Sequence, residues 1–299
     1  MSVSIPVDNC GNAASTAASA NGRCLSRREF VSGLIGAAGI LGLPAATAMD
    51  ASATVLLSPQ HRAFALAHAG EKYGLVQVLE TQATAVIGTP GRQFTLQLGP
   101  QQALRNVGAA WMASATELLV LDAHAYRLHR YALDGTPLGW SRIEGHSLPA
   151  AGGCADGSGG CYLSLPGDHQ IARLSRSGEL LQRFGQLGTA PGRLNYPTAI
   201  ARQADGSLVI ANTGNRRIDR YSAAGEFAGT LAQFEFMPRH LAISDQTLAV
   251  YDSHASRIAM LSLRTGVPMD SIALTASRTG PIQCRALTAA GGQRFLVSV

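Results

Sequence analysis

Residues 184–231 read FGQLGTAPGRLNYPTAIARQADGSLVIANTGNRRIDRYSAAGEFAGTL, and this stretch decides the fold. It holds short apolar runs at residues 196–201, 208–211, 218–221 and 227–231, each closed by turn residues such as Gly, Asp and Asn. Short apolar runs with this punctuation are typical of an antiparallel meander. We therefore expect four strands here, joined by tight turns, with Val209, Ile210, Ile218 and Tyr221 in the core.

The same stretch resembles an NHL repeat. The resemblance rests on residues 192–197 (GRLNYP), 204–206 (ADG) and 212–218 (NTGNRRI). The family form usually has Asp at the position of Asn212. The resemblance implies one four-stranded blade of a β-propeller, and it implies no activity, because propellers host many functions.

Other segments repeat this pattern. Residues 118–122, followed by Arg127-Leu128, match residues 208–212 and 217–218, and residues 248–252, followed by Arg257-Ile258, match them again. This recurrence predicts an all-β, six-bladed β-propeller whose blades start near residues 61, 105, 147, 196, 237 and 280. Residues 54–57 (TVLL) would pair onto the last blade and close the ring; the alternatives are another closing register or a seventh blade.

Two kinds of charged residue recur in these repeats. Arginines at 127, 217 and 257 precede the third strand, and acids at Glu80, Asp122 and Asp252 end strands. A catalytic role is possible, but an Arg repeated at one blade position is better explained as a tie between a turn and the adjacent blade. The acids would accept backbone N–H bonds in the turns.

Residues 1–48 are expected to precede the single propeller domain, residues 49–299. Residues 1 to 22 are rich in Ala, Ser, Asn and Gly and should be disordered. Arg27-Arg28 then precede an apolar, Gly-rich run that ends in Ala46-Thr47-Ala48. This layout predicts a twin-arginine signal peptide cleaved after Ala48, and hence a periplasmic protein with no stable membrane insertion. The alternative is a retained anchor, although the run is marginal for spanning.

Composition and motifs exclude several function classes. The formal net charge is +5, with Lys72 as the only lysine and no clustered basic run, so no nucleic-acid partner is expected. There is no Gly-x-Ser-x-Gly elbow, no phosphate-binding Gly loop and no haem-type Cys-x-x-Cys-His, so no cofactor is predicted. Nothing in the spacing selects a glycosidase pair among the strand-end acids. A monomer is expected.

The cysteines suggest one disulfide. Cys154 and Cys161 flank a Gly-rich turn, which in an oxidising compartment predicts a local disulfide, with a metal pair as the alternative. Cys10 and Cys24 fall in the leader. Cys284 falls in an innermost strand, as a buried thiol or facing the channel.

The candidate site lies where innermost strands line a central channel. The candidates on that side of the ring are Arg105, Trp111, Arg202, Arg239, His240 and Arg285. Some NHL-like propellers, such as the peptidyl-amidoglycolate lyases, place one His per strand around a channel metal. The positions equivalent to His240 are Ala199 and Ala109, so matching positions do not assemble such a site. His61, His68 and His240 would converge only in one register of the first blade.

Three hypotheses follow. The leading one is an exported, non-catalytic propeller that binds a protein partner or a ligand at one mouth, or serves as an accessory subunit of an exported complex. The second is a metal-dependent lyase or hydrolase at the channel mouth around His240. The third is a structural cell-envelope module with no specific binding face.

Overall fold

The structure is a computed structural model, and it describes only part of the 299-residue chain. The described residues are 2–4, 30–34, 52–57, 75–79, 84–89, 92–97, 107–123, 125–132, 136–143, 149–274, 284, 286–291 and 294–298. Most of these residues lie in β-strands. The helices of the described part are two 3₁₀ turns, η1 (Pro166–Asp168) and η2 (Thr213–Asn215), and neither could cross a membrane.

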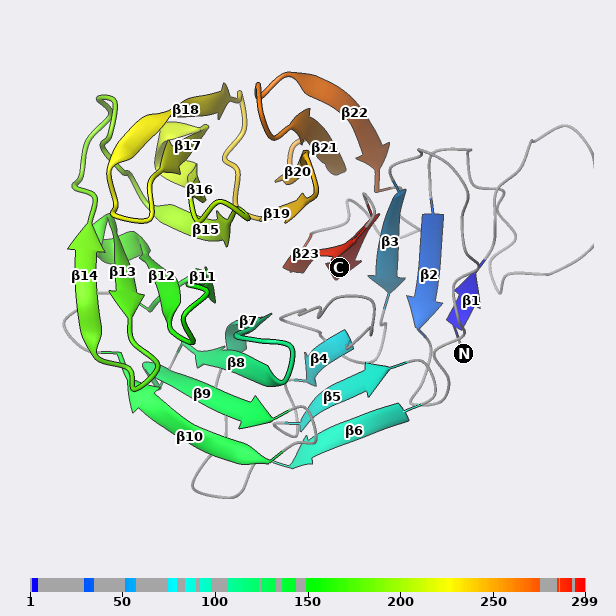
Figure 1. Ribbon diagram of the computed structural model, residues 1–299. Coiled ribbons are helices and arrows are strands. Elements are labelled where there is room, and N and C mark those ends of the chain that lie inside the picture. Colours follow the sequence, from blue (N-terminus) through cyan, green and yellow to red (C-terminus); the bar gives the residue numbers. More distant parts are fainter. Residues whose placement is uncertain are drawn as a thin grey trace, which may run out of the picture.

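Four antiparallel sheets of four strands stand around a common centre, so the chain forms a β-propeller (Figure 1). Blade A contains β7 (Val107–Met112), β8 (Glu117–Asp122), β9 (Arg127–Ala132) and β10 (Pro137–Arg142). Blade B contains β11 (Gly152–Ala155), β12 (Cys161–Leu165), β13 (Gln170–Leu174) and β14 (Leu180–Phe184). Blade C contains β15 (Pro197–Arg202), β16 (Leu208–Asn212), β17 (Arg217–Tyr221) and β18 (Phe227–Gln233). Blade D contains β19 (Leu241–Ser244), β20 (Thr247–Asp252), β21 (Arg257–Ser262) and β22 (Pro268–Ala273).

The remaining strands form two sheets of other sizes. One has three strands: β4 (Leu75–Leu79), β5 (Thr84–Thr89) and β6 (Arg92–Gln97). The other has five, in the order β1 (Ser2–Ser4), β2 (Phe30–Leu34), β3 (Ser52–Leu57), β24 (Arg294–Ser298) and β23 (Ala286–Gly291). The predicted number of six blades is therefore wrong, because the described residues form four four-stranded blades.

The three-stranded and the five-stranded sheet each differ from a four-stranded blade for a physical reason. The blade predicted to start near residue 61 shows three strands, and residues 58–74, where its first strand would stand, lie outside the described residues. Among the described residues two strands, β23 and β24, follow blade D, and the last sheet is completed by strands from the other end of the chain. The predicted strand at residues 54–57 lies there within β3, which pairs in parallel with β24. β1 and β2 are strands in a segment where the sequence predicts only a leader.

The core lies between neighbouring blades. The second strands β8, β12, β16 and β20 are buried along their whole length, because a blade stacks against each of their faces. Val209, Ile210 and Ile218 are fully buried and Tyr221 is 2% exposed, which confirms the core predicted for blade C. Burying each such side chain contributes about 1.5–3 kcal/mol.

The antiparallel order gives the propeller two faces. The starts of the first and third strands and the ends of the second strands lie on one face, which we call the mouth face; the turns between first and second strands lie on the opposite face. Each mouth-face turn between second and third strands has a left-handed residue at the same position, with φ of 46–56°. These residues are Tyr126, His169, Arg216 and Ser256, and none is a glycine.

Candidate functional site

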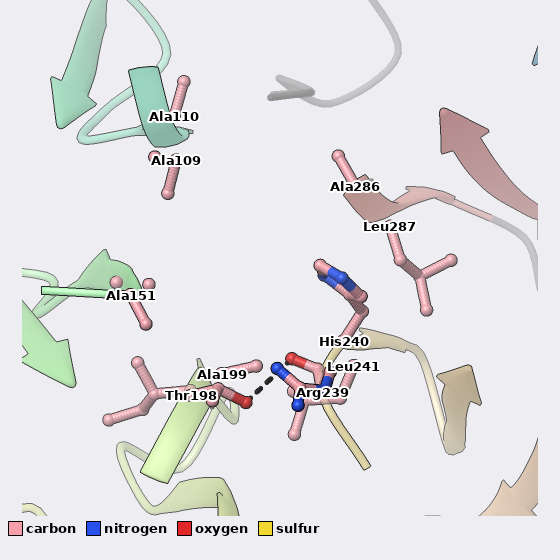
Figure 2. A pocket seen from close by; sticks show the side chains of 14 residues that line it. Ala109, Ala110, Ala151, Thr198, Ala199, Arg239, His240, Leu241, Ala286 and Leu287 are labelled. Carbon is pink, nitrogen blue, oxygen red and sulfur yellow. Dashed lines mark hydrogen bonds between the residues drawn. The ribbon is translucent and has the colours of Figure 1, made fainter. Parts of the chain in front are cut away.

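A cavity of about 240 Å³ lies at the centre of the ring, at the mouth-face end of five innermost strands (Figure 2). We call it the mouth cavity. Most of its walls carry only glycine or alanine, so the backbones themselves form the surface. The lining residues are 108–110, 151–153, 198–200, 239–241 and 286–287.

Arg239 and His240 are the polar exception, and blade C holds them in place. The Thr213 hydroxyl lies 2.6 Å from the Pro238 carbonyl oxygen, and the Thr198 hydroxyl lies 3.0 Å from that of Arg239. Figure 2 shows the second contact as a dashed line. The two hydroxyl oxygens are 2.7 Å apart, and both threonines are buried. The backbone leading into β19 is therefore fixed relative to blade C.

The two side chains differ in charge. Arg239 is exposed and is the only formally charged residue among the described lining residues. Burial, together with the neighbouring Arg239 charge, lowers the pKa of His240 to about 4. The imidazole is therefore neutral at neutral pH, with its ring 6.3 Å from that of Tyr251. The site presents one positive charge, on a side chain whose backbone is anchored, beside a neutral group that can donate or accept a hydrogen bond.

Trp111 lies in a seam between blades rather than in the channel. It is 8% exposed and belongs to the core shared by blades A and B. A Cβ on Gly153 would lie 2.5 Å from its ring, so the indole fills the space that this glycine leaves open. Its neighbours Ala109 and Ala110 line the mouth cavity instead.

Arg202 lies at the far end of β15, on the opposite face. It lines a second cavity of about 750 Å³ between blades C and D, together with Arg220 and Arg264. The structure thus brings Arg239 and His240 together and separates Arg202 from them. Arg105, Arg285, Arg27, Arg28 and Ala48, and the histidines at 61 and 68, lie outside the described residues.

The predicted disulfide between Cys154 and Cys161 is not present, and both thiols are free. Cys154 pairs with Tyr162 across the hairpin, whereas Cys161 pairs with Ala155. Directly paired residues share a face and successive residues alternate, so the two sulfurs point to opposite faces of blade B. Burial raises the pKa of the Cys161 thiol to about 12 and also raises that of Cys154, so both thiols are protonated and unreactive.

Cys284, the third described cysteine, is buried, and its thiol lies 3.4 Å from the Ala286 carbonyl oxygen. Of the two positions that the sequence left open, it takes the buried one. In the described part of the chain, no three His, Cys, Asp or Glu side chains are grouped so that they could hold a metal ion.

The strand-end acids Asp122 and Asp252 accept turn N–H bonds as predicted, and Glu80 lies outside the described residues. Among the described residues, the tie of the repeated arginines to an adjacent blade is not found for Arg127 and Arg257, whose contacts with Trp140 and Asp252 lie within their own blades. Asp122 accepts a bond from the Ala125 N–H, and Asp252 accepts bonds from the N–H groups of His254 and Ala255. Thr198 and Thr213 were not singled out from the sequence. The signal available was weak: a Thr directly after the first-strand Pro197, and another in an Asn-Thr-Gly turn.

No protein-family model matches this chain, and no curated protein matches it either. Solved structures do. A virginiamycin B lyase from Staphylococcus aureus aligns with a TM-score of 0.58 and 14% identity, covering 77% of this chain and 75% of that one. A streptogramin B lyase aligns with a TM-score of 0.59 and 13% identity over 79% and 74% of the two chains. A chain of a nidogen/laminin complex aligns with a TM-score of 0.61 and 13% identity over 81% and 86%. At these identities the similarity shows the β-propeller fold alone.

Proposed function

We propose that this chain is an exported, NHL-like β-propeller that binds a protein or a small ligand at the mouth cavity. The observation that carries the proposal is the placement of Arg239. Arg239 is the charged residue among cavity-lining residues that are mostly glycine and alanine. The hydroxyls of Thr198 and Thr213 anchor its backbone through the carbonyls of Arg239 and Pro238. A charged side chain on an anchored backbone in a concave site suits ligand binding, because the backbone does not have to be ordered when the ligand arrives.

Export is the second part of the proposal. Arg27-Arg28, the apolar run and Ala48 support a twin-arginine signal peptide and a periplasmic, monomeric product. Fractionation of expressing cells, with N-terminal sequencing of the periplasmic form, tests this part. We expect the wild type to yield a mature periplasmic protein that starts at Met49. The control is a variant in which both arginines are replaced by lysine, and we expect it to stay in the cytoplasm at full length. Full-length, wild-type protein confined to the cytoplasm would refute export.

A protein partner is supported by one neighbour in fold, since a similar propeller occurs in a nidogen/laminin complex. The test is capture from a periplasmic extract with the purified mature protein, followed by mass spectrometry. We expect one defined partner to be retained by the wild type and lost from Arg239→Gln. Arg264→Gln, an exposed arginine on the opposite face, is the matched control and should retain it. Equal retention by both variants would refute binding at the mouth.

The second candidate function is a lyase or hydrolase at the same mouth. It is favoured by the similarity to two lyases and by the place of His240 in the cavity wall. The described residues do not fit a metal site, so no metal step is derived. Metal analysis of the purified mature protein, with turnover assays of wild type and His240→Ala, decides between the two. Stoichiometric metal together with activity lost in His240→Ala would replace the binding proposal.

A further inference from the structure

Resting on the proposed function, we infer that the mouth cavity binds its ligand through a carboxylate, with the ligand's slender apolar part lying between the small-residue walls. The carboxylate belongs to a small apolar acid or to a peptide C-terminus, and both present the same chemistry to the site. The argument uses Arg239, His240 and the composition of the described walls.

The charge of Arg239 is available to a ligand. No described residue makes a hydrogen bond or an ion pair with its guanidinium, and no described lining residue is acidic. Other arginines of the fold are engaged: Arg217 bonds three carbonyl oxygens, and Arg173 bonds Asp156. An unpaired guanidinium in a concave site matches an anion, and its planar fork matches a carboxylate best.

His240 decides between kinds of anion. The imidazole is uncharged at neutral pH, so it adds no second positive charge to the site. One guanidinium balances a monoanion such as a carboxylate, whereas a phosphate dianion would leave uncompensated charge in a partly desolvated cavity. The neutral ring can still bond a carboxylate oxygen or a nearby amide of the ligand.

The walls decide the shape of the rest of the ligand. Ala109 and Ala199 leave space where longer side chains would close the channel, and Leu241 and Leu287 supply apolar surface. The alanine at 199 stands at the blade position that His240 occupies in blade D. A cavity of about 240 Å³ suits a short aliphatic chain or one C-terminal residue rather than a folded domain.

The test uses matched acids and amides as probes. Hexanoate and hexanamide represent free acids, and acetyl-Ala-Ala-Leu with a free or an amidated C-terminus represents peptides; binding is measured by calorimetry on the mature protein. We expect at least one acid to bind about tenfold or more tightly than its amide, since the difference is one charge-assisted pair. Which pair shows the preference identifies the source of the carboxylate.

Three variants complete the experiment. Arg239→Gln should remove the preference for the acid, and Arg264→Gln should keep it. Ala199→Leu should weaken acid and amide alike, because it fills the cavity while leaving Arg239 in place. Equal binding of acids and amides to the wild type, or no binding of any probe, overturns the inference. A different result would refute the proposed function: capture of the protein partner by Arg239→Gln at the level of the wild type.

Discussion

Blades C and D place an arginine at the start of the third strand, yet the two residues contribute differently. The Arg217 side chain is 9% exposed; its Nε donates to Asp219 at 2.8 Å, and its terminal nitrogens donate to the carbonyls of Thr189, Ala190 and Arg193. The Arg257 side chain is 45% exposed and donates to Asp252 at 3.0 Å. The position in the repeat therefore determines where the Arg Cα lies in the blade. The segment that connects the blade to the preceding one determines which hydrogen-bond acceptors the guanidinium finds. The connection before blade C, residues 185–196, folds back over Arg217 and supplies those three carbonyls.

The strand-end residue differs for the same reason. Asp252 accepts two turn N–H bonds and the Arg257 ion pair, which requires a carboxylate. Asn212 instead donates its amide to Asp219 at 2.6 Å and to the Arg193 carbonyl, while its oxygen accepts the Asn195 N–H. A carboxylate at 212 would face the buried carboxylate of Asp219. This explains the departure from the NHL pattern at Asn212.

Replacing each arginine tests whether the two residues differ in their contribution to stability. We expect Arg217→Met to lower the free energy of unfolding by about 3 kcal/mol or more, because it leaves the buried Asp219 carboxylate without its cation. Arg257→Met should cost about 0–1 kcal/mol, since its ion pair is half in solvent. Urea unfolding of both variants at pH 7 measures this. Equal losses would show that the longer connection adds nothing.

Exchanging the strand-end residues tests the second difference. Asn212→Asp should destabilise the protein by about 1–3 kcal/mol, because it removes a donor from Asp219 and from the Arg193 carbonyl. Asp252→Asn is the matched exchange and should cost about 1 kcal/mol or less, because one side-chain oxygen still accepts the turn N–H bonds. Thermal unfolding of the two variants side by side gives the order. A more stable Asn212→Asp protein would contradict the role given to Asp219.

Blade B adds a third case, because Leu165 stands at the strand-end position and the buried carboxylate, Asp156, lies on the opposite face. Burial alone would raise the pKa of Asp156, but hydrogen bonds from Ser158 and Arg173 outweigh it and leave the pKa lowered. A lowered pKa stabilises the fold above the unfolded value of about 3.9, and this contribution is lost as the pH falls through the folded value. Asp156→Asn should therefore cost about 1 kcal/mol at pH 7.

The difference between wild type and Asp156→Asn should shrink as the pH is lowered below about 4. Urea unfolding at pH 7, 5 and 3 follows it, with Asp205→Asn as the control, since Asp205 bonds Ser207 in the corresponding turn of blade C but is exposed. If the difference in unfolding free energy between wild type and Asp156→Asn stays constant across this pH range, the ionised state of Asp156 does not contribute to stability.

The sequence was enough for features that depend on neighbours along the chain. The strands of blade C, the core at Val209 and Ile218, and the turn bonds of Asp252 all follow from a few consecutive residues. Arg239 and His240 were found because they follow a Pro that opens a blade. Their supports were missed, because Thr198 and Thr213 bond backbone carbonyls that any residue would present.

Features that depend on pairing across strands were not predictable. Cys154 and Cys161 face opposite ways because Ala155, not Cys154, is the partner of Cys161. Ala109 and Trp111 share a face of β7, yet Ala109 lines the mouth cavity whereas the Trp111 ring packs against Gly153 of blade B, a partner far along the chain. The blade count was wrong, although the predicted pairing of residues 54–57 with the last sheet is confirmed by the ladder between β3 and β24.

The left-handed residues around the mouth have one further consequence. Tyr126, His169, Arg216 and Ser256 hold their turns without glycine, and a chain with side chains at such sites has fewer alternative shapes to explore. These turns of the mouth face should therefore keep their shape when a ligand binds, with backbone shifts of about 1 Å or less. A mouth face that does not change shape admits or excludes ligands by their size, whatever polar groups they carry.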